Sequence, residues 1–241
     1  MQSKRADSGG NDPKARSAAR LIVGNRIDAG NGSAAHAAPG GQASAREILR
    51  RETDVAHRRL HADPWLSAVA EGRVDRPGFR VVLAHLFGFY RPLEDRLAAS
   101  GFGAVTGIEF ASHARAPFLR DDLRFLGLRA DEIEALAACT ALPEIDSPSA
   151  FLGCLYVLDG SRLGGSLLAR ALDSLFPADQ IEGRSFFAAH RDRIGAIWRE
   201  TCAAIEACGS DEQHLHEMVL SAREAFAALE AWQAVSPDRE A

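Results

Sequence analysis

Residues 156–165 read YVLDGSRLGG and lie inside a predicted helix, 148–175. Three glycines within six residues cost roughly 2–3 kcal/mol of helix propensity relative to alanine. A sequence tolerates that cost where something must approach the backbone closely or where the helix must bend. Tight helix–helix packing through small residues is the alternative interpretation. No strand precedes the glycines and no GK[ST] follows them, so the stretch is not a phosphate-binding loop.

The chain around this stretch shows helical periodicity from Ser44 onward. Ser44 and Glu47 have the spacing of a capping box, and Pro92 is a potential kink in a long apolar helix. No alternating apolar–polar pattern and no internal repeat is found. The sequence therefore predicts an all-α fold. The expected helices are 44–62, 65–71, 77–100, 113–127, 131–138, 148–175, 184–208 and 211–234.

The first 45 residues differ from the rest in composition. They are rich in Gly, Ala, Ser, Asn and Asp and hold one short apolar patch, 21–23. Such a segment cannot bury enough surface to offset its ordering entropy. We predict a disordered N-terminal extension, 1–45, followed by a single helical domain, 46–236.

Composition and charge exclude several classes of protein. No run of eighteen apolar residues or secretory h-region occurs, which predicts a cytoplasmic protein without a membrane segment. The four cysteines are scattered and form no CxxC pair, so we expect them to be buried structural residues in a protein of a reducing compartment. They are Cys139, Cys154, Cys202 and Cys208. Residues 1–46 hold seven Lys or Arg against three Asp, or +4, so the remainder carries −9 to reach −5. An acidic body argues against nucleic acid as a partner.

The first helix carries a polar stripe that includes two histidines. Its members recur at helical spacing and are Arg50, Thr53, Asp54, His57 and His61. One interpretation is a solvated face. Another is a metal site, because HxxxH places two imidazoles on one face, but no third ligand motif is evident. A di-metal site would need Glu-x-x-His sets, and none accompanies Glu94 and His85.

Two of these features together resemble a known family. Thr53-x-x-x-His57, followed by Gly160-Ser-x-Leu-Gly164-Gly165, looks like the haem oxygenases, and most like their bacterial, biliverdin-producing branch associated with bacteriophytochromes. The likeness covers about residues 46–234 and includes 88–94, 186–198 and 222–226. It implies a single-domain, haem oxygenase-like fold of several helices.

The resemblance also implies roles for matched residues. His57 would be the proximal ligand of the haem iron, with Thr53 in the same haem-binding stretch. Gly160, Gly164 and Gly165 would let the backbone of the distal helix lie over the haem face. Ser161 stands where other members often carry an acid that orders distal water, so the proton-delivery group is left open. His61 either orients His57 or faces solvent.

The haem propionates require cations, and in the predicted domain every basic residue is an arginine. Arg50 on the first helix and Arg191 resemble the family's propionate-binding positions, with His190 as a possible assistant. A neutral histidine ligand suits this chemistry, because a thiolate would favour O–O cleavage.

The implied activity is oxidative opening of haem, as substrate and cofactor, to biliverdin with release of CO and Fe²⁺. The sequence contains no flavin or NAD motif, so a ferredoxin or a flavin reductase would supply electrons. A bacteriophytochrome would be a candidate recipient of the biliverdin. The alternative function is a non-catalytic sensor or carrier of haem or bilin.

Overall fold

The computed structural model describes residues 43–177, 179–188 and 192–235, and only the backbone of residues 61, 166 and 167. All regular elements in these ranges are helices, which confirms the all-α prediction. The predicted extension, 1–45, lies outside the described residues except for 43–45. Ala45, the last residue of the predicted extension, already belongs to the first described helix.

The α-helices are α2 (Ala45–His61), α3 (Pro64–Ala70), α4 (Arg76–Ser100), α5 (Phe102–Thr106), α6 (Ala116–Phe125), α7 (Ala130–Glu134), α8 (Pro148–Ala171), α9 (Ser185–Ala188), α10 (Ile194–Cys208) and α11 (Glu212–Gln233). Two 3₁₀ turns are added to these, η1 (Phe110–Ser112) and η2 (Leu172–Ser174).

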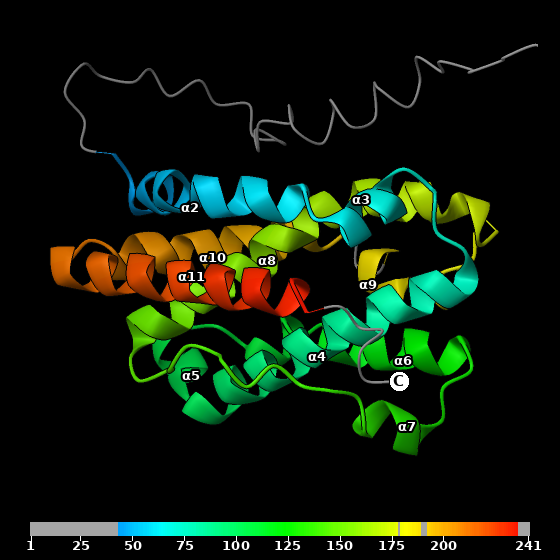
Figure 1. The fold of residues 1–241 in the computed structure, drawn as a ribbon. Helices are drawn as coiled ribbons and strands as arrows, with labels where there is room; N and C mark the ends of the chain where they lie inside the picture. Colours follow the sequence, from blue (N-terminus) through cyan, green and yellow to red (C-terminus); the bar gives the residue numbers. More distant parts are fainter. Residues whose placement is uncertain (1–42, 178, 189–191, 236–241) are drawn as a thin grey trace, which may run out of the picture.

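Helix α8 lies at the centre of the bundle. In Figure 1, α2 lies above it, α10 and α11 lie beside it, and α4, α5, α6 and α7 lie below. Helix α11 packs against both α8 and α2, while α10 packs mainly against α8 and α4 against α6. The side chains of the first half of α8 are buried, including Phe151 and Leu155 at 0% exposure. This burial accounts for the apolar run in the sequence.

One glycine of α8 permits its closest contact with α11. A Cβ at Gly153 would lie 2.4 Å from the carbonyl oxygen of Met218, which is too close for any side chain. Gly153 lies outside the predicted glycine motif, and α8 continues as one helix through that motif to Ala171. Small-residue packing therefore occurs on α8, but before the motif rather than in it.

Four predicted helices are shorter than expected. The helix predicted over 131–138 ends at Glu134, and the one predicted over 148–175 ends at Ala171, where the 3₁₀ turn η2 follows. The helix predicted over 113–127 begins only at Ala116, because the Glu94 carboxylate binds the N–H groups of Arg115 and Ala116 and so caps α6 at that point. The helix predicted over 184–208 is not continuous in the described residues, where α9 ends at Ala188 and α10 begins at Ile194. The prediction also missed α5, which Gly101 and Gly107, both at φ 74°, delimit.

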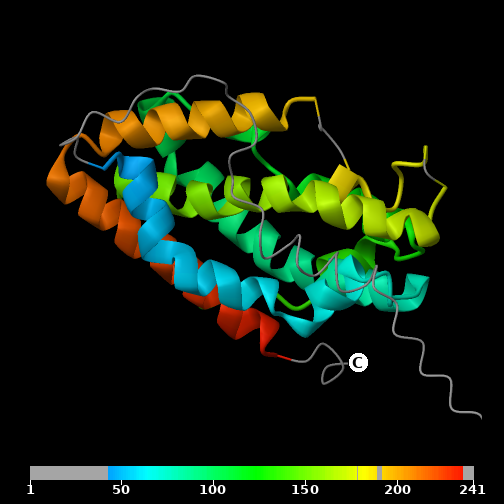
Figure 2. The same ribbon diagram turned by 90° about the horizontal axis from the view of Figure 1, so that it is seen from above.

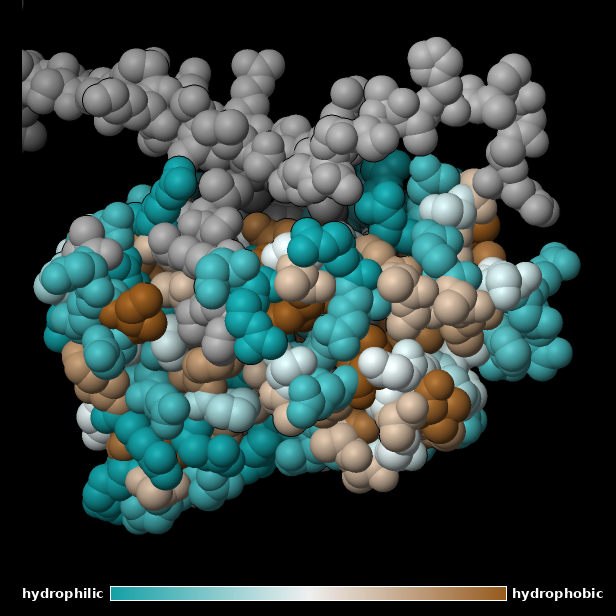
Figure 3. Space-filling model, turned by 180° about the vertical axis from the view of Figure 1, so that it is seen from behind, coloured by the Kyte–Doolittle hydropathy of each residue, from teal (hydrophilic) through white to brown (hydrophobic). Residues whose placement is uncertain are grey.

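A helix that spans a membrane requires a minimum length and hydropathy. Among the described helices, none is long and apolar enough to cross a bilayer. Figure 3 shows the face opposite to that in Figure 1, where hydrophobic side chains form small groups interrupted by hydrophilic residues.

Candidate functional site

Helix α2 presents part of its polar stripe to the protein interior. The Ser44–Glu47 capping box is present at its start, as predicted. Thr53 is 2% exposed, and its hydroxyl donates to the carbonyl of Leu49. The apolar side chain of Val55, by contrast, is 54% exposed. The helix is therefore rotated so that the side containing Thr53 faces the bundle.

His57 lies one turn beyond Thr53 and is half-buried. Its imidazole meets the buried Phe226 ring of α11 edge-on, with 6.3 Å between ring centroids. The backbone of His61 belongs to the last turn of α2, but its side chain lies outside the described residues. The two candidate histidines are thus on one helix, and only His57 has described surroundings.

Helices α2 and α8 come near each other at Thr53 and Tyr156 and then diverge. Tyr156 of α8 lies near Thr53 of α2; burial raises the pKa of Tyr156, and the side chain of Thr53 and nearby Arg50 oppose the rise. Both helices run in the same general direction, and Figure 2 shows them separating along their lengths. His57 and Gly160 each lie one turn beyond the contact. They therefore stand where the two helices begin to separate.

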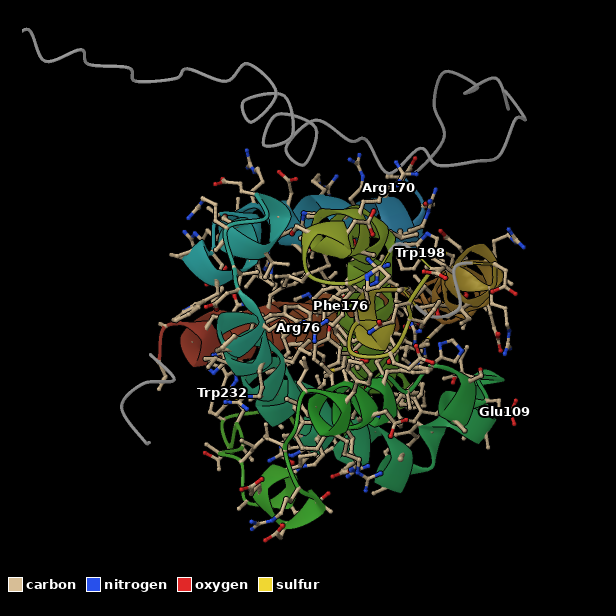
Figure 4. All side chains as sticks on the ribbon, turned by 90° about the vertical axis from the view of Figure 1, so that its right-hand side faces the viewer. Arg76, Glu109, Arg170, Phe176, Trp198 and Trp232 are labelled. Carbon is tan, nitrogen blue, oxygen red and sulfur yellow. The ribbon has the colours of Figure 1, made fainter. Side chains whose placement is uncertain are left out.

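Two of the three motif glycines, Gly160 and Gly165, are not required by close helix packing. A Cβ at Gly160 would meet only the Trp198 ring, at 3.9 Å, and a Cβ at Gly165 would meet nothing closer than 3.8 Å. Both are ordinary van der Waals distances. Trp198 comes from α10 and lies beside α8 in Figure 4. Gly160 is half-buried and Gly165 is buried against Phe187, and neither is explained by close contact with a neighbouring helix.

Ser161 connects the glycine motif to a buried arginine. Its hydroxyl accepts a hydrogen bond from Nη1 of Arg115 at 2.7 Å and lies 2.9 Å from the Tyr90 hydroxyl. It donates to the Leu158 carbonyl, at 2.6 Å. Ser161 itself is exposed, whereas Arg115 is 3% exposed.

A buried ionic cluster supports the helix next to the motif. The Asp159 carboxylate binds Nδ1 of His113 at 2.7 Å, the Thr201 hydroxyl at 2.7 Å and Nε of Arg162 at 3.0 Å. Arg162 also donates to the His113 carbonyl. Nε2 of His113 is buried, and its nearest carboxylate is Glu200 at 3.8 Å. The cluster joins α8, α10 and the segment before α6, and so fixes the orientation of the motif.

Sequence reasoning missed this cluster. Asp159 appeared only as a letter of the motif, and the other members are distant in sequence. The available signal was a pair of charged residues, Asp159 and Arg162, three apart in an otherwise apolar helix. Such residues are rarely buried unless they are paired.

The remaining predicted site residues lie apart from this centre or outside the described chain. Arg50 is exposed on α2, close enough to influence Tyr156. Arg191 and His190 lie outside the described residues. The His85 ring stacks on the Trp232 ring, with 4.9 Å between centroids. Glu94 instead accepts the N–H of Ala116 at the start of α6, so the two residues do not form a metal site together. In the described part of the chain, no three potential ligands gather into a metal site.

Glu94 makes the stability of the fold depend on pH. Burial raises its pKa from 4.5 to about 7, although the N–H groups of Ala116 and Arg115 oppose the rise. The folded state therefore keeps a proton that the unfolded state releases, and the stabilisation is complete below pH 4.5 and lost as the pH rises through 7. We expect the wild type to lose about 2 kcal/mol of unfolding free energy between about pH 5 and 7.5 relative to Glu94→Gln. Urea unfolding at the two pH values measures this, and parallel pH slopes would contradict it.

Comparison with known proteins identifies the family. Residues 43–234 match the family model described as Heme oxygenase. The chain is similar to a protein named Heme oxygenase from Xanthomonas campestris pv. campestris (strain 8004), with 32% identity over 145 residues. That match covers 58% of this chain and 79% of the relative.

Solved structures show the same fold. The NO- and CO-bound heme oxygenase of Neisseria meningitidis is 20% identical with a TM-score of 0.62, covering 83% of this chain and 96% of its own. The heme oxygenase of Leptospira interrogans is 15% identical with a TM-score of 0.65, covering 80% and 99%. Heme oxygenase-1 of the cyanobacterium Synechocystis sp. PCC6803, in complex with heme, is 20% identical with a TM-score of 0.60, covering 80% and 91%.

Proposed function

The chain belongs to the haem oxygenase family, and we propose that it binds haem between α2 and α8 and opens the ring to biliverdin, with release of CO and Fe²⁺. The activity class follows from the family. The products, the position of the haem and the roles of individual residues are our proposal.

One observation carries the proposal. Helices α2 and α8 separate along their lengths in Figure 2, and His57 of α2 and Gly160 of α8 follow Thr53 and Tyr156 by one turn each. A histidine on one helix and a glycine-rich stretch on the other suit a flat macrocycle, since glycine would let the backbone approach one face while histidine would bind the metal from the other.

The residues present fit haem. His57 would ligate the iron through a neutral imidazole, and the Phe226 ring beside it restricts the rotation of that imidazole. Arg50 is exposed on the same helix, two turns before His57, and would meet a propionate at the edge of the site. Arg191 would bind the other propionate.

Haem supplies the oxygen and redox chemistry, and the side chains of this chain control its surroundings. The motif places a hydroxyl at position 161 rather than a carboxylate, and the nearest acid on α8, Asp159, faces a buried cluster. Bulky acid–base groups are thereby kept from the glycine face, where they would promote O–O cleavage. Backbone dipoles and the Ser161 hydroxyl remain to hold water and oxygen there.

The electrons would come from a separate protein, a ferredoxin or a flavin reductase, and the biliverdin would serve a bacteriophytochrome. These partners rest on the family resemblance alone. The arginines on the exposed side of α2, which are Arg46, Arg50, Arg51, Arg58 and Arg59, offer an acidic donor a basic surface on an otherwise acidic protein.

Reconstitution with haemin tests the proposal. The purified protein is loaded with haemin, a reductant system is added in air, and the visible spectrum is recorded. We expect the Soret band to disappear while a broad red bilin absorption grows and CO is released. A Soret band that persists under these conditions would support a carrier of haem instead, and failure to bind haemin would contradict both functions.

A further inference from the structure

Three arginines are buried in the described part of the chain, and one of them differs from the others. Arg162 pairs with Asp159 at 3.0 Å, and Arg184 pairs with Asp173 at 2.5 Å. Among the described residues, no carboxylate lies within ion-pair distance of the Arg115 guanidinium. The nearby Glu94 carboxylate binds the backbone N–H of Arg115 instead.

The Arg115 guanidinium contacts neutral groups only. Nη1 donates to the Ser161 hydroxyl at 2.7 Å and to the Tyr90 hydroxyl at 3.4 Å, and Nη2 donates to the Phe186 carbonyl at 2.9 Å. The Phe186 ring lies 3.8 Å from Cζ. These contacts satisfy hydrogen bonds but do not neutralise the charge. The carboxylates of Glu94 and Asp159 act on this charge only from beyond ion-pair distance. A buried ion that is not directly paired costs several kcal/mol, so its presence calls for an explanation.

Ser161 links the buried Arg115 guanidinium to the exposed face of α8 through a hydrogen bond. It is adjacent to Gly160, and it is the only exposed residue that Arg115 contacts among those described. A hydroxyl that accepts a hydrogen bond from a cation is polarised, and its own proton becomes a stronger donor. With its two acceptor positions held by Arg115 and Tyr90, Ser161 can direct that proton either to Leu158 or outward.

We propose that Arg115 is a positioning residue that acts through Ser161 to stabilise a small anion at the glycine face of the site. The inference rests on the proposed function, because that face is defined by bound haem. Arg115 donates no proton in this role. It lowers the energy of negative charge that develops on a small oxygen ligand beside Gly160, as preorganised cations and dipoles do.

Fluoride binding to the ferric haem complex tests the inference without turnover. Wild type, Ser161→Ala and Ser161→Asp are loaded with haemin and titrated with fluoride at one pH, followed in the visible spectrum. We expect about tenfold weaker fluoride binding for Ser161→Ala, the scale of one charge-assisted hydrogen bond, and a larger loss for Ser161→Asp. Imidazole, a neutral ligand, should bind all three within about twofold.

Ser149→Ala is the matched control. Ser149 lies on the same helix, and its buried hydroxyl contacts Sγ of Cys208 at 3.6 Å, away from the glycine motif. This variant should bind fluoride as the wild type does. A comparable loss in Ser149→Ala would show that any lost hydroxyl on α8 has the same effect, and it would overturn the inference.

The haem-free protein provides a second readout. A carboxylate at position 161 would pair with the buried guanidinium, so Ser161→Asp should raise the thermal midpoint by about 3 °C or more over Ser161→Asn, which adds a neutral group of similar size. Stabilising the fold while weakening fluoride binding is a combination that a purely structural hydrogen bond does not produce.

The outcomes are distinguishable. Failure of the wild type to bind haemin contradicts the proposed function and removes this inference with it. Normal haemin binding with equal fluoride affinities in wild type, Ser161→Ala and Ser161→Asp overturns the inference alone. An unchanged thermal midpoint in haem-free Ser161→Asp would show that the Arg115 charge is already neutralised, and would overturn it as well.

Discussion

His57→Ala is expected to lose the histidine-ligated spectrum of the ferric haem complex and to form no biliverdin. The reason is that α2 offers only one described imidazole in the region where it separates from α8. The change truncates a half-buried side chain beside Phe226, so the haem-free fold should persist. Added imidazole should occupy the space left and restore the ligated spectrum, which visible and resonance Raman spectroscopy would record.

His61→Ala is the matched control for this prediction. The two histidines are four residues apart on one helix, and the sequence alone presents both as candidate ligands. We expect His61→Ala to retain the ligated spectrum and turnover. If His61→Ala lost ligation and His57→Ala kept it, the assignment of the proximal ligand would be reversed.

The sequence predicted the fold well where local patterns decide the structure. The capping box at Ser44 and the helix-starting Pro148 gave helix starts within one residue of those observed. The helix predicted from 113 failed because its start depends on a distant carboxylate, Glu94, which is about twenty residues earlier in the chain. Periodicity records which face of a helix is apolar, but it carries no information on which remote side chain caps it.

The candidate site was predictable to a similar extent. The resemblance predicted that His57 and Gly160 belong to one site, and each lies one turn beyond Thr53 or Tyr156 on its own helix. That the two residues hold one haem stays a prediction. The ionic cluster of Asp159 and the unpaired charge of Arg115 were not anticipated. Both depend on side chains from three or four separate segments, and a single sequence does not reveal which charged residues become partners.

Gly160→Leu should strongly weaken haem binding while leaving the haem-free fold intact. A Cβ at this position meets only the Trp198 ring, at 3.9 Å, and α8 gains helix propensity of up to about 1 kcal/mol when a glycine is replaced. The haem-free variant should therefore be at least as stable as the wild type, by thermal unfolding. A leucine side chain would fill the space that the macrocycle requires against the backbone, so haemin affinity should fall by about 100-fold or more, the scale of a lost large apolar contact.

Gly153→Ala should show the opposite result, and the pair separates the two interpretations of a glycine-rich helix. Its Cβ would lie 2.4 Å from the Met218 carbonyl, and overpacking of this kind costs about 1–3 kcal/mol of stability or more. The folded fraction of Gly153→Ala should still bind haemin, since Gly153 is two turns from Gly160 and faces α11. If Gly160→Leu instead destabilised the haem-free protein as much as Gly153→Ala, the motif glycines would be packing residues. The proposal that haem lies against the glycines of α8 would then be contradicted.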